Sequence, residues 1–201
     1  MEIMNNSGLQ RLVPIALVLI VIIVAIAALV SLGRSIFGGG ASEPVVDTGR
    51  EALLNTALDR SVRMTVRGPI VADENFHSYT VTVSPTTRVL TTYEGYLDRQ
   101  VDTKQLVNNT RGYEQFVYAL DRTNVTDAVT LEADAADMRG ICATGRVYQY
   151  EIMQASNVVK KIWTTTCSKS KGSLKASNTT ISKLFQAQIP DYSDLTQKVK
   201  L

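Results

Sequence analysis

Hydrophobic and polar positions divide the chain into one long apolar run and a longer segment with short periodic patterns. Residues 12–32 contain no charged side chain, and Arg11 and Arg34 flank them. A helix of this length spans about 31 Å, which matches the roughly 30 Å hydrocarbon core of a bilayer. The pattern predicts a short cytoplasmic tail (1–11) and a transmembrane helix (12–33) through which the chain contacts the lipid bilayer.

A cleaved secretory signal is the alternative interpretation of this run. Ala25 and Ala27 offer a small-residue cleavage site. The run nevertheless continues to Leu32, and the segment before it carries only one arginine. We therefore expect a retained anchor, followed by a flexible Gly-rich linker over residues 34–47.

The first half of the remaining chain alternates between helical and strand-like periods. Thr48 and Glu51 resemble a capping box at the start of a helix that runs to about Arg60. Two-residue alternation then predicts three strands, and a helical stripe from Gly112 to about Arg122 predicts a second helix. The strands cover residues 62–67, 77–83 and 88–93, and Asn109 or Thr110 is available to cap the second helix.

The second half predicts a hairpin and a last helix. Residues 141–153 and 158–167 indicate two strands joined by a turn at 154–157, and Leu174 indicates a further short strand. A helical stripe through Ile181 and Phe185 ends at Pro190, before a polar tail (191–201). Residues 48–190 are thus expected to form one α+β domain of antiparallel strands packed with two to three helices.

The two cysteines lie at matching ends of the predicted hairpin. A turn centred between Gln154 and Ala155 places Cys142 opposite Cys167. Opposed residues in an antiparallel pair have Cα atoms about 4.5 to 5.5 Å apart, within the range of a disulfide. Because disulfides persist in oxidising compartments, we expect the domain to lie outside the cell membrane, with the N-terminus inside.

Charge is distributed unevenly along the domain. Residues 72–140 carry 6 basic and 11 acidic side chains, whereas residues 142–201 carry 9 basic and 3 acidic ones. Lysine suits diffuse anionic surfaces, so this excess predicts contact with an anionic polymer, lipid head groups or an acidic protein; a merely solvated surface is the alternative. No nucleic-acid binding is expected, because no cluster of arginine and aromatic residues is present. The candidate binding residues are Lys160, Lys161, Lys169, Lys171 and Lys175.

One segment is similar to a catalytic motif. Residues 164–167 (TTTC) are similar to the TLxTC signature of sortases, which implies Cys167 as the nucleophile of a transpeptidase and His77 as its base. The chain departs from that pattern, with Thr165 where sortases have leucine and no arginine after Arg146. We therefore assign no catalytic residue. One histidine and two cysteines also predict no metal site, and no cofactor is expected.

A broader resemblance concerns the two ends of the chain. The apolar run, the glycines at 38–40 and the ending LFQAQIPDY (184–192) resemble uncharacterised single-pass envelope proteins of small-genome bacteria. The resemblance implies a cell-membrane location and no particular activity. The sequence predicts a membrane-anchored extracytoplasmic interaction or structural module. A subunit of a larger membrane complex is the alternative, since Ala25, Ala27, Ala28 and Ser31 could pack against another helix.

Overall fold

The computed structural model describes residues 22, 48–132, 136–170, 172–197 and 199. The predicted tail, transmembrane helix and linker lie outside these residues, apart from Ile22. Within these ranges, no helix has the length and apolar content that a membrane crossing requires. The chain divides into two units, residues 1–46 and 47–201, and the fold described below is that of the second.

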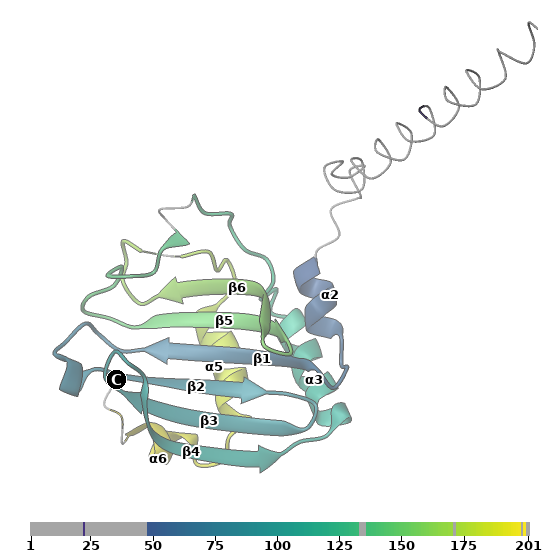
Figure 1. The fold of residues 1–201 in the computed structure, drawn as a ribbon, viewed down its shortest axis with the longest axis horizontal. Helices are drawn as coiled ribbons and strands as arrows, with labels where there is room; N and C mark the ends of the chain where they lie inside the picture. Colours follow the sequence, from purple (N-terminus) through teal and green to yellow (C-terminus); the bar gives the residue numbers. More distant parts are fainter. Residues whose placement is uncertain (1–21, 23–47, 133–135, 171, 198, 200–201) are drawn as a thin grey trace, which may run out of the picture. The chain divides into compact units, whose positions relative to one another are not determined.

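The domain is built on one antiparallel sheet of six strands in the order β4-β3-β2-β1-β5-β6 (Figure 1). The first four strands form a meander, and the β5–β6 hairpin pairs with the free edge of β1. The expected α+β class with antiparallel pairing is thereby confirmed. The strands are β1 (Arg60–Arg67), β2 (His77–Val83), β3 (Thr87–Glu94), β4 (Arg99–Val107), β5 (Val147–Gln154) and β6 (Asn157–Thr165).

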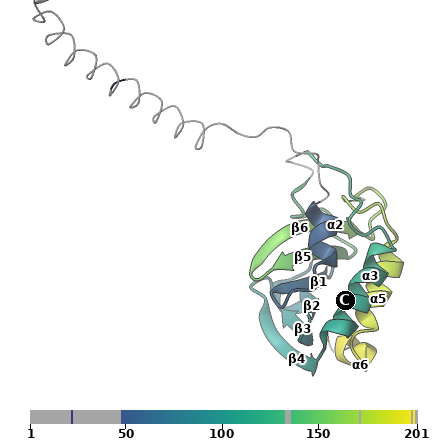
Figure 2. The same cartoon turned by 90° about the vertical axis from the view of Figure 1, so that its right-hand side faces the viewer.

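The helices that the structure describes lie on one side of this sheet (Figure 2). Of the two predicted caps, Asn109 is the one that caps α3, where its side chain accepts a hydrogen bond of 2.8 Å from the Gly112 N–H. Ser177 caps α5 in the same way. The helices are α2 (Thr48–Leu54), α3 (Thr110–Asp121), α5 (Asn178–Gln186) and α6 (Tyr192–Gln197), and a 3-10 turn, η1 (Asp73–Asn75), lies between β1 and β2.

The core fills the space between the sheet and these helices. Alternation along β1 buries Val62, Met64 and Val66 on the helix side. The apolar stripes of α3 and α5 meet there, where the rings of Phe116 and Phe185 pack edge to face with centroids 5.1 Å apart. The opposite face of the sheet therefore carries the polar positions of these strands.

The segment predicted as a polar tail contains α6, which packs against this core. The hydroxyl of Tyr192 donates a hydrogen bond to that of Tyr79. Burial raises the pKa of the Tyr79 hydroxyl well above its usual value, so that hydroxyl stays protonated. Lys104 on β4 adds hydrogen bonds of 3.1 Å to Pro190 O and to the Asp191 carboxylate.

Two further elements differ from the sequence prediction. Strand β4 was not expected, because its inward side includes Asp102 and Lys104 while Val101 and Val107 are exposed. Such an edge strand lacks the apolar alternation that marks a half-buried strand. The first helix ends at Leu54 instead of about Arg60, since β1 already begins at Arg60.

The predicted register of the hairpin is wrong by three residues over most of its length. The turn residues are Ala155 and Ser156, with Ala155 in the left-handed region, so Gln154 pairs with Asn157. A bulge between Ile152 and Met153 adds one more residue of shift. Beyond the bulge the shift is odd, which turns the side chains of β6 there to the other face. Ile162 therefore lies on the core face with Tyr150, and Trp163 lies on the opposite face.

Candidate functional site

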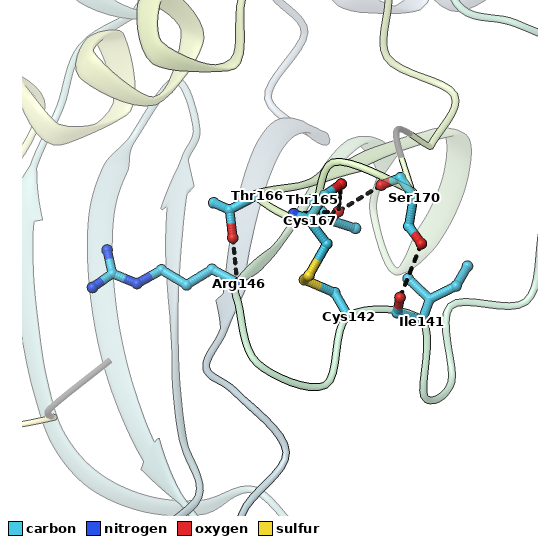
Figure 3. Close-up of a disulfide and its surroundings, with 7 residues drawn as sticks. All are labelled: Ile141, Cys142, Arg146, Thr165, Thr166, Cys167 and Ser170. Atoms are coloured by element: carbon cyan, nitrogen blue, oxygen red, sulfur yellow. Dashed lines mark hydrogen bonds between the residues drawn. A yellow bond between two sulfur atoms is a disulfide. The ribbon is translucent and has the colours of Figure 1, made fainter.

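A disulfide joins Cys142 and Cys167 next to the ends of β5 and β6, with their Cα atoms 5.7 Å apart (Figure 3). The predicted pairing is confirmed, but the two residues lie outside the strands. Strand pairing continues only to Arg146 and Thr166, where the Thr166 N–H donates to Arg146 O over 3.0 Å. Residues 143–145 then loop out and lead back to Cys142.

Hydrogen bonds reinforce the disulfide on both sides (Figure 3). The Thr165 hydroxyl accepts from the Cys167 N–H over 3.0 Å and donates to Ser170 O. The Ser170 hydroxyl in turn donates to Ile141 O over 3.0 Å. The segments that carry the two cysteines are therefore held together by side-chain and backbone bonds as well as by the covalent link.

Two further loops at the same end of the sheet are attached to this segment. The Ile70 N–H, in the β1–β2 connection, donates to Ala143 O over 2.8 Å. Tyr96, in the β3–β4 turn, donates from its hydroxyl to Val71 O over 2.7 Å. Its ring stacks on Phe76 with centroids 4.1 Å apart. Three connections that are distant in sequence thus form one framework.

This framework encloses a pocket with a volume of about 470 Å³. We call it the loop pocket. Its walls are mostly apolar and come from the three connections, while β1, β5 and β6 contribute one side chain each. The lining residues include Ile70, Phe76, Tyr96, Met138, Ile141 and Val147, together with the charged residues Arg67, Lys161, Asp137 and Arg139.

The charges of the loop pocket are not balanced. Arg139 and Asp137 neutralise each other, and the hydrogen bonds from Arg139 lower the pKa of the Asp137 carboxyl to about 2. Lys161 lies across from Glu151, but that buried carboxylate is bound by Arg63 at 2.6 Å. The Arg67 guanidinium lies 5.3 Å from the centre of the Phe76 ring. Within the described part of the chain, no acidic side chain pairs with Arg67 or Lys161.

The five predicted lysines do not form one cluster. Lys161 and Lys160 point to opposite faces of β6, and Lys160 lies against Gly49 and borders a second hollow with Asp121 and Asp127. Lys175 pairs with Asp127 at 2.9 Å. Lys169 is exposed just after Cys167, whereas Lys171 lies outside the described residues.

Sequence reasoning missed most of the loop pocket. Arg67, Ile70, Phe76 and Tyr96 were not singled out, although Ile70 and Tyr96 are apolar residues in connections where polar side chains are usual. Ile70 is 49% exposed and Tyr96 is 40% exposed. Large apolar side chains in short connections are the signal that could have found them.

The residues of the sortase-like motif do not meet. His77 begins β2, and its Nδ1 lies 2.9 Å from Asn75 O. Strands β1 and β5 separate β2 from β6, after which Cys167 lies. Neighbouring strands are about 4.8 Å apart, so the backbones of β2 and β6 lie roughly 14 Å from each other. The sulfur of Cys167 is also bonded to Cys142. Over the described ranges, no group of three or more metal-ligating side chains gathers.

No protein-family model matches the chain, and no curated protein matches its sequence. The residues and geometry described above are thus the grounds for assigning a function.

Proposed function

We propose that this chain is a single-pass membrane protein whose α+β domain lies outside the cell membrane and acts as an interaction module for anionic partners. Residues 12–33 serve as the anchor, and the Gly-rich residues 34–47 separate it from the domain. The partner is an anionic envelope polymer or an acidic protein.

The Cys142–Cys167 disulfide is the observation that supports this location most strongly. Such bonds form and persist in oxidising compartments and are rare where thiols are kept reduced. Together with the uncharged run near the N-terminus, the bond favours a domain on the outer side of the membrane. An anchored domain of this kind meets its partner at the membrane surface.

The contact with an anionic partner is supported by the lysines that acidic side chains leave unpaired. In the described portion of the chain, Lys161 and Lys169 have no acidic partner, whereas Lys175 is paired with Asp127. Both of these candidate lysines belong to β6 or to the disulfide segment that follows it. We therefore assign the contact to this side of the domain.

The location is tested by labelling the cysteines in intact cells. A membrane-impermeant maleimide should label neither cysteine before reduction and both after treatment with an impermeant reductant. Labelling without reduction, or only after the cells are lysed, would contradict the proposed location. The chain that is unfolded in denaturant, reduced and then labelled gives the reference signal for two reacted cysteines.

The contact is tested with the full chain in vesicles and poly-L-glutamate as an anionic probe. Binding should weaken as ionic strength rises, because salt screens exposed charges over about 10 Å at 0.1 M. Replacing Lys161 and Lys169 by glutamine should weaken binding, whereas the same change at Lys160 and Lys175 should have little effect. Binding that does not change with ionic strength would argue against this contact. An equal loss of binding in the Lys161/Lys169 and Lys160/Lys175 double variants would also argue against it.

A further inference from the structure

The loop pocket combines features that an ordinary surface hollow lacks. Its apolar walls include Phe76, which is 2% exposed and stacks under Tyr96. Ile70 at its rim is half exposed, although it is fixed by its hydrogen bond to Ala143. Apolar side chains held rigidly at a surface are typical of a place where another molecule is bound.

The two unpaired cations decide the charge of that molecule. Arg67 and Lys161 reach the loop pocket from β1 and β6, while the remaining charged pair, Arg139 and Asp137, is internally balanced. An anionic group is therefore favoured at the sheet side of the pocket, and an apolar group against the apolar side chains of the connections.

We infer that the loop pocket binds a small organic carboxylate with an apolar body. The volume of about 470 Å³ lies within the range of about 300 to 1,000 Å³ typical of small-molecule sites. The carboxylate is bound by Arg67 and Lys161, and the body packs between Ile70, Met138 and Ile141. A guanidinium and an ammonium both form strong, charge-assisted hydrogen bonds with a carboxylate.

The three connections preorganise this site. Hydrogen bonds join the β1–β2 connection to the disulfide segment and to Tyr96, and the disulfide holds the segment after β6. The backbone of these connections is therefore held in place before a ligand binds, which lowers the free-energy cost of association.

This inference deepens the proposed function, since it rests on an anion-binding role for this side of the domain, but it does not depend on membrane topology. It also requires one compact ligand with an apolar part, which an anionic polymer does not offer. The two can therefore fail separately.

The test is calorimetry on the full chain in nanodiscs of zwitterionic lipid, with empty nanodiscs as the blank. The ligands are 4-phenylbutyrate, its uncharged amide, and acetate. The carboxylate should bind at one site, and the amide should bind at least about tenfold more weakly because it cannot form the charge-assisted bonds. Acetate, which lacks the apolar body, should give no measurable heat.

Lys161→Gln and Arg67→Gln should each weaken the binding of 4-phenylbutyrate about tenfold. Lys160→Gln is the matched control, because it removes the same charge from the neighbouring residue on the other face of β6 and should leave affinity unchanged. Both lysine variants should keep the far-ultraviolet circular dichroism of the unchanged protein. The inference would be overturned if 4-phenylbutyrate did not bind, or if its amide bound equally well. It would also be overturned if Lys160→Gln weakened binding as much as Lys161→Gln. These outcomes are independent of the result of the cysteine labelling.

Discussion

At the scale of single residues, close contacts around the disulfide limit which side chains the segment accepts. A Cβ atom at Gly145 would lie 2.4 Å from Thr166 Oγ1 and 2.8 Å from Cys142 Sγ. Neither atom belongs to a flexible side-chain end, because Thr166 Oγ1 accepts a hydrogen bond from the Arg146 N–H and the sulfur is covalently bonded. Glycine is therefore required at this position by space and not by its backbone angles.

Gly145→Ala should consequently destabilise the domain. Forcing a methyl group into such a contact costs about 1 to 3 kcal/mol, which lowers the free energy of unfolding by that amount. Urea unfolding followed by circular dichroism measures it. Thr144→Ala, at the exposed neighbouring residue, is the control and should change stability by less than about 0.5 kcal/mol. Equal urea midpoints for Gly145→Ala and Thr144→Ala would show that the backbone around residue 145 shifts to accept the methyl group at no cost.

At the scale of elements, an ion pair joins two helices whose relative position the periodic pattern does not predict. Arg50 on α2 donates two hydrogen bonds, of 2.7 and 2.9 Å, to the carboxylate of Asp121 at the end of α3. These hydrogen bonds lower the pKa of the Asp121 carboxyl. The two residues lie 71 positions apart in the chain, so sequence periodicity could predict both helices but not this pair.

Asp121→Asn should reduce stability at neutral pH by up to about 1 kcal/mol. Because the pKa of this carboxyl is lowered in the folded state, its contribution is present above the unfolded value of about 3.9 and is lost as the pH falls through the folded value. Urea unfolding at pH 7 and at pH 3 or below tests this. The variant should differ from the unchanged protein at pH 7, and the difference should shrink in acid.

Asp127→Asn is the matched control for this measurement. Asp127 also pairs with a cation, Lys175, but both side chains are more than half exposed. Such pairs contribute little, so its effect at pH 7 should be smaller than that of Asp121→Asn. A difference at Asp121 that persists or grows in acid would contradict the expected role of its carboxylate.

Much of the secondary structure follows from local patterns, and the exceptions have identifiable causes. The alternation of β1 and the cap of α3 were predicted correctly because each depends on neighbours in sequence. Strand β4 was missed because its pairing with β3, and not an apolar face, holds it in the sheet. The register of β6 was missed because the turn is centred one residue later than predicted, and because a bulged residue then reverses the faces of the strand and leaves no mark in the periodicity.

At the scale of the whole molecule, the disulfide closes one end of the sheet. It joins residues 25 positions apart, and the segments it links border the loop pocket together with the β1–β2 and β3–β4 connections. The other end of the hairpin lies toward α2, where Lys160 packs against Gly49. The bond therefore stabilises the end of the domain that carries the proposed ligand site.

Removing the disulfide should lower the free energy of unfolding by about 3 kcal/mol, because the reduced chain gains entropy when it unfolds. That is a large share of the free energy of unfolding of a folded domain, which is typically about 5 to 15 kcal/mol. Thermal unfolding with and without reductant measures the loss. A Cys142→Ser and Cys167→Ser double variant should resemble the reduced protein and should not respond to reductant. Unchanged melting after complete reduction would refute the expectation.

Local sequence determined the apolar run, the periods of most strands and helices, the cap of α3 and the two cysteines available for bonding. Tertiary structure decided which face of β6 is buried, that β4 and α6 join the domain, and that Arg67, Phe76, Tyr96 and Lys161 border one pocket. The physical reason is that periodicity reports only on neighbours along the chain. Strand order, a bulge and hydrogen bonds between distant connections bring the pocket residues together, and these depend on the whole fold.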